Sequence, residues 1–242
     1  MTFSEMTPPM PADPRMTDPF PDLIDAVERA DSASLLLQTT RALAEALATH
    51  RQEETAPPPP GAALTCLVRI LGYNNPGAAV AAVDGLIASG PAAVSALLEG
   101  LDDHNYGARA WAVRALAGIG DVRGLDVLEQ ALAGDVGPSV RRAAAIGIGT
   151  LRVDPLASDE RRTVHDRALA ALERARHDGE WVVRYAVATA IERLVFSLPG
   201  KNEGQDRGRA VSILVSLADI LQEEVPVVRL RAQLGLNRLG AP

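Results

Sequence analysis

The feature that most constrains this chain is a helical pattern that returns about every 30 to 45 residues. It is clearest at 102–120, DDHNYGARAWAVRALAGIG, where small and apolar residues recur at spacings of three and four. In a helix these residues form one apolar stripe, made of Ala108, Ala112, Ala115, Leu116 and Ile119. Similar segments lie at 75–86, 140–151, 182–194 and 227–240. The chain is therefore built from copies of one structural unit.

A second helical segment separates each copy from the next, so that each unit holds two helices. Units of this length with two helices are typical of an α-solenoid with HEAT or armadillo-like repeats. The composition fits, since 47% of the residues are hydrophobic and only 3% aromatic, as expected of closely packed helices rich in Ala, Leu and Val. The sequence therefore predicts an all-α fold, an α-solenoid of about five helix pairs with an N-terminal helical extension.

The predicted organisation has four parts. Residues 1–19 are rich in proline, show no periodicity and are expected to be disordered. Residues 20–52 are expected to form a helical hairpin, which either caps the solenoid or docks on a partner. Residues 53–61, EETAPPPPG, indicate a stiff linker, and residues 62–242 form the repeat solenoid.

Charge and composition limit the function. The net charge is −7, and residues 1–60 carry ten acidic but only four basic side chains, which leaves the repeat region nearly neutral. This balance argues against nucleic-acid binding, which depends on neutralising phosphates. No run reaches the roughly 18 apolar residues of a membrane span, and the N-terminus has no basic region followed by an apolar run. With Cys66 as the only cysteine, we expect a soluble cytoplasmic protein without an internal disulfide.

The sequence carries no recognisable catalytic or metal-binding motif. Its four histidines are scattered: His50, His104, His165 and His177. Zinc-ligand spacings, nucleotide-phosphate loops and nucleophile signatures are all missing. Cys66 lies in an apolar segment, where a packed and inert thiol is the simplest interpretation. We therefore predict no catalytic residue, no metal site and no resident cofactor.

Two groups of aromatic and basic residues differ from the repeat pattern. Trp111 and Arg114 lie three apart and off the apolar stripe, at positions where later copies carry alanine, isoleucine or threonine. They suggest a platform for a flat, anionic ligand. Trp181, Arg184 and Tyr185 repeat this theme two units later. The alternative for both groups is packing between neighbouring repeats.

Polar residues also crowd the turn before the clearest helix: Asp102, Asp103, His104, Asn105 and Tyr106. An Asp or Asn there caps the helix, which leaves His104 and Tyr106 as candidate ligand contacts. In addition, one repeat position carries arginine in four copies: Arg109, Arg141, Arg184 and Arg229. These arginines either bind carboxylates of a ligand or hold carbonyls and acidic side chains of the neighbouring repeat.

Four segments carry a more specific resemblance: LGYNNPGAAVAAVDGLI, LDDHNYGARAWAVRALAGIGD, PSVRRAAAIGIGTLR and EWVVRYAVATAIERL. Together they resemble the F-type (beta) subunit of the cyanobacterial E/F-type phycobilin lyases, a HEAT-repeat family. The resemblance spans about residues 64–195. The strings DDHNYGARAW and EWVVRYA are more specific than general HEAT spacing.

The resemblance implies a subunit of a heterodimeric bilin lyase. Together with an E-type (alpha) subunit, it would bind phycocyanobilin as substrate and attach it by a thioether to a cysteine of the phycocyanin alpha subunit. The acceptor supplies the thiol, which agrees with the lack of a catalytic nucleophile here. Bilins are flat and carry two propionates, which suit aromatic rings and arginines. The expected bilin-binding residues are Asp102, Asp103, His104, Tyr106, Arg109, Trp111, Arg114, Arg141, Trp181, Arg184 and Tyr185.

A second class of function stays open at this point. A non-catalytic HEAT-repeat scaffold that binds phycobiliprotein or bilin during phycobilisome assembly or degradation would have the same architecture. Fold alone does not separate the two, because function belongs to the site. Covalent attachment of bilin to an acceptor protein separates them.

Overall fold

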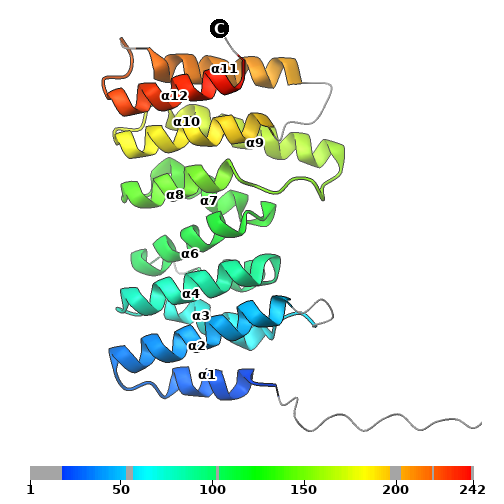
Figure 1. Cartoon of the computed structure of the whole chain (residues 1–242), viewed down its shortest axis with the longest axis vertical. Helices are drawn as coiled ribbons and strands as arrows, with labels where there is room; N and C mark the ends of the chain where they lie inside the picture. Colours follow the sequence, from blue (N-terminus) through cyan, green and yellow to red (C-terminus); the bar gives the residue numbers. More distant parts are fainter. Residues whose placement is uncertain (1–17, 53–56, 102–103, 197–202, 220, 241–242) are drawn as a thin grey trace, which may run out of the picture.

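The computed structural model describes residues 18–52, 57–101, 104–196, 203–219 and 221–240. Within these ranges the helices form an elongated stack that runs from α1 at one end to α11 and α12 at the other (Figure 1). The five helix pairs from residue 61 onward confirm the predicted α-solenoid for the described part of the chain.

The helices alternate between two layers. We call one of them the even layer, and it holds α2 (Ala33–Gln52), α4 (Pro76–Ser89), α6 (Tyr106–Ile119), α8 (Pro138–Ile148), α10 (Trp181–Phe196) and α12 (Pro226–Arg238). The odd layer holds α1 (Phe20–Glu28), α3 (Gly61–Ile70), α5 (Ala93–Glu99), α7 (Leu125–Gly134), α9 (Ser158–Ala175) and α11 (Glu203–Ala218). Single 3-10 turns, η1 (Gly90–Ala92) and η2 (Val122–Gly124), precede α5 and α7. Each even helix packs against the even helices before and after it.

The N-terminal hairpin continues this stack. Helix α2 packs along α4, and α1 packs on α2 and α3, so that the hairpin covers the first end of the solenoid (Figure 1). Residues 53–56 of the predicted linker, and residues 1–17 of the segment expected to be disordered, lie outside the described residues.

The core follows the apolar stripe seen in the sequence. In α6, four of the five predicted stripe residues are buried: Ala112, Ala115, Leu116 and Ile119. Small residues then let neighbouring even helices approach closely. A Cβ atom on Gly147 would lie 2.7 Å from the Cα of Ala117, and one on Gly149 would lie 2.5 Å from the Cα of Ala190. Glycine is required at these two contacts because backbone fills the space.

The segment Pro76–Glu99 is long and apolar enough to cross a membrane by length and composition alone. In the structure the turn η1 splits it into α4 and α5, and 56% of its most apolar window is buried inside the stack. Its hydrophobicity is therefore that of a core helix pair.

Two asparagines cap the even helices α4 and α6. Asn75 caps α4 by accepting the N–H of Ala78 at 3.1 Å, and Asn105 caps α6 by accepting the N–H of Ala108 at 3.0 Å. The side-chain amide of Asn75 also donates to a backbone carbonyl of the preceding unit, at Ala33 (2.9 Å). Each cap thus fixes the start of its helix, and Asn75 also ties α4 to the preceding unit.

Candidate functional site

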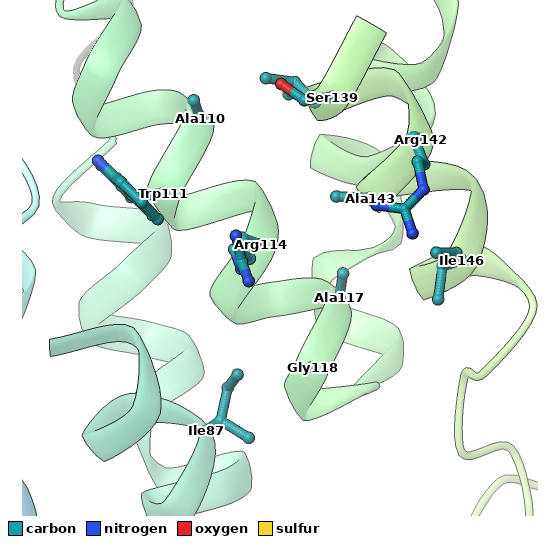
Figure 2. A pocket seen from close by; sticks show the side chains of 11 residues that line it. Ile87, Ala110, Trp111, Arg114, Ala117, Gly118, Ser139, Arg142, Ala143 and Ile146 are labelled. Atoms are coloured by element: carbon teal, nitrogen blue, oxygen red, sulfur yellow. The ribbon is translucent and has the colours of Figure 1, made fainter. Parts of the chain in front are cut away.

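A groove of about 460 Å³ opens on the even layer where α4, α6 and α8 are neighbours (Figure 2). Its lining residues are Ile87 from α4, Ala110, Trp111, Arg114, Ala117 and Gly118 from α6, and Ser139, Val140, Arg142, Ala143 and Ile146 from α8. The volume falls within the range of small-molecule sites, about 300–1,000 Å³. The groove therefore combines an apolar lining with two arginines from different helices.

Helix geometry explains how these residues share one surface. Trp111, Arg114 and Gly118 are spaced three and four apart, so that they lie on the same face of α6. Gly118 leaves room for the side chain of Ile87, because a Cβ atom at position 118 would lie 2.4 Å from the Cδ1 atom of Ile87. Ile87 thus reaches the groove from the neighbouring helix (Figure 2).

Trp111 combines the two roles that the sequence left open. The ring is partly buried and packs against the core, yet it also lines the groove. The guanidinium of Arg114 lies 5.8 Å from the centroid of the ring, which is within cation–π distance. The ring therefore has a fixed position, and Arg114 beside it is exposed.

The two groove arginines differ from most arginines of this chain. In the described part of the protein, neither Arg114 nor Arg142 forms an ion pair with a carboxylate. Arg141, the neighbour of Arg142 in sequence, points elsewhere and binds Asp178 through two hydrogen bonds of 2.7 and 3.0 Å. Two guanidinium groups without a carboxylate partner among the described residues therefore line the groove.

The repeated arginine position has a structural role in the C-terminal units. Arg141 holds the carboxylate of Asp178 in the next unit and donates to the backbone carbonyl of Asp135 at 2.8 Å. Arg184 binds the carboxylate of Glu223 at 2.5 and 2.8 Å and donates to the carbonyl of Asp178 at 2.7 Å. The loops before α8, α10 and α12 are each held by arginines from two successive units.

We call the four repeated arginines, Arg109, Arg141, Arg184 and Arg229, the arginine ladder, and the two at its ends also hold connecting loops. Arg109 pairs with Asp135 at 3.4 Å, and Arg229 donates to the backbone carbonyl of Glu223 at 2.8 Å. This is the second of the two interpretations open for these residues, in which they hold the neighbouring repeat. Neither Arg141 nor Arg184 lines the groove beside Trp111.

Two arginines of the ladder, Arg141 and Arg184, also lower the pKa values of the carboxyl groups that they bind. Two hydrogen bonds from Arg184 hold the pKa of the Glu223 carboxyl below its usual range, although burial acts in the opposite direction. Burial likewise raises the pKa of Asp178, but hydrogen bonds from Arg141 and from the backbone N–H of Glu180 outweigh it, so the pKa is lowered overall. Both acids are therefore ionised at neutral pH and bind their arginines as carboxylates.

The remaining predicted residues lie away from the groove or outside the described chain. Tyr106 is exposed at the start of α6, and the guanidinium of Arg109 lies 5.5 Å from the centroid of its ring. Arg109 lines a separate hollow together with Asp135. His104 is exposed in the turn before α6. Asp102 and Asp103 are not among the described residues.

The second aromatic group lies on α10. Trp181 is exposed at the start of this helix, and Tyr185 is half-buried against the core. Of the predicted bilin-binding residues that the structure describes, the groove brings together Trp111 and Arg114. A role in bilin binding for the others stays a prediction.

Arg142 was missed by the sequence analysis. A signal was present, because the same repeat position holds Val80, Ala110, Tyr185 and Leu230 in the other copies. The pair Arg141–Arg142 hid it, since one arginine of the pair already matched the repeat. Only the orientation of α8 reveals that the second arginine faces the groove (Figure 2).

The described residues contain no group of three or more His, Cys, Asp or Glu side chains able to hold a metal ion. Cys66 is buried, and burial raises the pKa of its thiol, with the charge of Arg69 acting in the opposite direction. A buried and protonated thiol is a poor nucleophile.

The fold and its groove define a HEAT-repeat protein with a ligand-sized site on the even layer. Residues 64–149 match the family model described as HEAT repeats. The chain is 49% identical over 172 residues to the phycocyanin alpha phycocyanobilin lyase CpcF of Synechocystis sp., which covers 71% of this chain and 75% of that protein. The chain belongs to the family of phycocyanobilin lyase beta subunits, the F-type subunits, as the sequence resemblance indicated.

Two further relatives agree. The chain is 49% identical over 184 residues to the phycocyanobilin lyase subunit beta of Pseudanabaena tenuis, a match that covers 76% of this chain and 61% of that protein. It therefore spans less than two thirds of the length of that relative. Among solved structures, a chain of the complex of CpcE and CpcF of phycocyanin lyase from Nostoc sp. is 38% identical, with a TM-score of 0.63, and the match covers 72% of this chain and 98% of that one.

Proposed function

We propose that this chain is the beta subunit of a heterodimeric phycocyanobilin lyase. Together with an E-type partner subunit, it binds phycocyanobilin and attaches it to a cysteine of the phycocyanin alpha subunit, in the cytoplasm. The observation that carries this proposal is the 49% identity to a phycocyanin alpha phycocyanobilin lyase, over three quarters of that protein. The similarity to a chain of the CpcE and CpcF complex supports the heterodimer.

The groove beside Trp111 supplies a site for the bilin. Its apolar lining, with Ile87 and Ile146, suits the flat pyrrole rings, and the indole of Trp111 offers an aromatic surface for them. Arg114, exposed beside the indole, is free to bind a propionate. Binding at this surface leaves the reactive end of the bilin accessible to a second protein.

The chemistry itself needs no nucleophile from this chain. The sulfur of the acceptor cysteine forms a C–S bond with an unsaturated carbon of the bilin, the thiol proton is taken up by the bilin, and no group leaves. The lyase contributes by holding the two reactants in position. Orientation of this kind lowers a bimolecular barrier by as much as roughly 7 to 11 kcal/mol in ideal cases. The buried Cys66 thiol is consistent with this division of labour.

Co-expression tests the proposal. The chain is produced with an E-type subunit, an enzymatic source of phycocyanobilin and the apo-phycocyanin alpha subunit, and the acceptor is examined for bilin fluorescence on a denaturing gel. We expect covalently coloured acceptor with the wild-type chain and a strong loss with the double variant Trp111→Ala/Arg114→Ala. A control variant, Arg29→Ala/Arg162→Ala, removes two exposed arginines, one directly after α1 and one in α9, and should retain attachment.

The result also separates the lyase from a scaffold. A bilin complex that forms without any covalent adduct would contradict the lyase and favour the non-catalytic alternative. Normal attachment by the Trp111→Ala/Arg114→Ala variant would leave the lyase standing but remove the groove as its bilin site.

A further inference from the structure

The two arginines of the groove come from different repeats and stand on opposite walls. Arg114 extends from α6, and Arg142 extends from α8 (Figure 2). Apolar side chains line the space around them, including Ala117 and Ile146. Such an arrangement presents two separate cationic contacts around an apolar surface.

The repeat pattern makes this pair specific to one groove. Where Arg114 stands in α6, the later even helices carry Ile146, Thr189 and Leu234. Where Arg142 stands in α8, α6 carries Ala110 and the later even helices carry Tyr185 and Leu230. The copy in α4 carries Asp84 at the first of these positions and Val80 at the second. Arginine therefore occupies these two face positions only where they meet across the groove between α6 and α8.

An arginine at a comparable position elsewhere in the even layer is paired with an acid. Between α10 and α12, Arg231 occupies the repeat position of Trp111, and it is buried against Glu192 at 2.7 Å. It also donates to the hydroxyl of Thr189 at 2.9 Å. Arg231 is thus neutralised by an internal acid, whereas no carboxylate of the described residues lines the groove that holds Arg114 and Arg142.

We propose that Arg114 and Arg142 form a two-point carboxylate clamp that makes the groove selective for a flat ligand with two carboxylate arms. This inference rests on the proposed function, in which the groove holds phycocyanobilin, and it assigns the two propionates of the bilin to the two arginines. The guanidinium group matches a carboxylate in geometry and stays charged at all relevant pH values. Arg142 is the residue that distinguishes the diacid from a tetrapyrrole with blocked or missing carboxylates.

Binding of two forms of the same pigment tests the clamp. Phycocyanobilin and its dimethyl ester have the same ring system, but the ester carries no negative charge. Each is titrated into the complex of the chain with its E-type subunit, and binding is followed by the absorbance shift of the pigment. We expect the wild-type complex to bind the diacid at least about tenfold more tightly than the ester, the loss expected for one charge-assisted hydrogen bond.

Variants at Arg142 test whether this residue causes the preference for the diacid over the ester. Arg142→Ala should weaken binding of the diacid about tenfold and leave binding of the ester unchanged, so that the preference falls. Arg142→Lys keeps the charge without the planar fork and should restore part of it. The exposed-arginine control, Arg29→Ala/Arg162→Ala, should behave like the wild-type chain with both pigments. Circular dichroism confirms that each variant is folded.

The outcomes distinguish failure of the clamp from failure of the proposed function. If the wild-type complex binds both pigments equally, or if Arg142→Ala weakens both by the same factor, the clamp is wrong while bilin binding stands. If the wild-type complex binds neither pigment, the proposed function fails and the clamp fails with it.

Discussion

Removal of Arg184 tests whether the arginine ladder holds the repeats together. The Arg184→Ala variant leaves the carboxylate of Glu223 in place without the guanidinium that binds it at 2.5 and 2.8 Å. The side chain of Glu223 is only 2% exposed and that of Arg184 only 16%, so water does not replace the lost contacts. Breaking a buried pair on one side costs about 3–5 kcal/mol, because an uncompensated charge stays behind.

A double variant separates charge from packing. In Arg184→Ala/Glu223→Gln no buried charge is left, and the glutamine can still accept the backbone N–H of Val225. We therefore expect the double variant to be more stable than Arg184→Ala alone, by about 1 kcal/mol or more. The exposed pair of Arg29 and Asp25, in which the arginine is 79% exposed, provides the control, and Arg29→Ala should cost less than about 1 kcal/mol.

Urea unfolding followed by circular dichroism gives these free energies. All variants are measured at pH 7 and low salt, and the midpoints are compared at matched slopes. A loss below about 1 kcal/mol in Arg184→Ala would refute the ladder as a stabilising device. The single variant Glu223→Gln completes the comparison, and a double variant as unstable as the sum of Arg184→Ala and Glu223→Gln would refute the explanation by a buried charge.

Three further predictions concern the pH dependence of the ladder, a close contact between two helices and a helix cap. The pKa of the Glu223 carboxyl is lowered in the folded chain, so its stabilising effect is complete above the pKa of the unfolded carboxyl. This effect is lost as the pH falls through the folded pKa. The difference in free energy of unfolding between the wild-type chain and Arg184→Ala should therefore narrow below about pH 4 in urea titrations. Gly149→Ala should cost about 1–3 kcal/mol because its Cβ would meet backbone, whereas Gly134→Ala, with open space, should be neutral in thermal melts. Asn105→Ala should lower the free energy of unfolding by about 1 kcal/mol through loss of the α6 cap.

Much of the architecture could be predicted from the sequence because the spacing of apolar residues within and between the repeats predicts both the helices and their stacking. The stripe that includes Leu116 and Ile119 fixes the buried face of α6, and the recurrence of that stripe fixes the stacking of the units. Trp111 and Arg114 could be selected as site residues because they lie off the apolar stripe, at positions where later copies carry other residue types. Departures from a repeat are visible without coordinates.

Other features depend on contacts between units and could not be predicted in this way. The acids of the ladder, Asp178 and Glu223, lie in connecting loops 37 and 39 residues from their arginines, and those loops differ in length from unit to unit. Arg142 follows an arginine that matches the repeat, so its different orientation appears only when α8 is placed beside α6. Sequence periodicity identifies the exposed face of a helix, but packing decides which exposed residues share a groove.

We propose that this chain positions the bilin in the Trp111 groove and supplies no reactive group to the chemistry. The most direct measurement is the single-turnover rate at which bilin, preloaded on the complex of the chain with its E-type subunit, is transferred to the phycocyanin alpha subunit. We predict that Trp111→Ala/Arg114→Ala slows the transfer at least about tenfold, whereas Cys66→Ala transfers at the wild-type rate. An unchanged rate in the double variant, or a rate that collapses with Cys66→Ala in a folded chain, would contradict the claim.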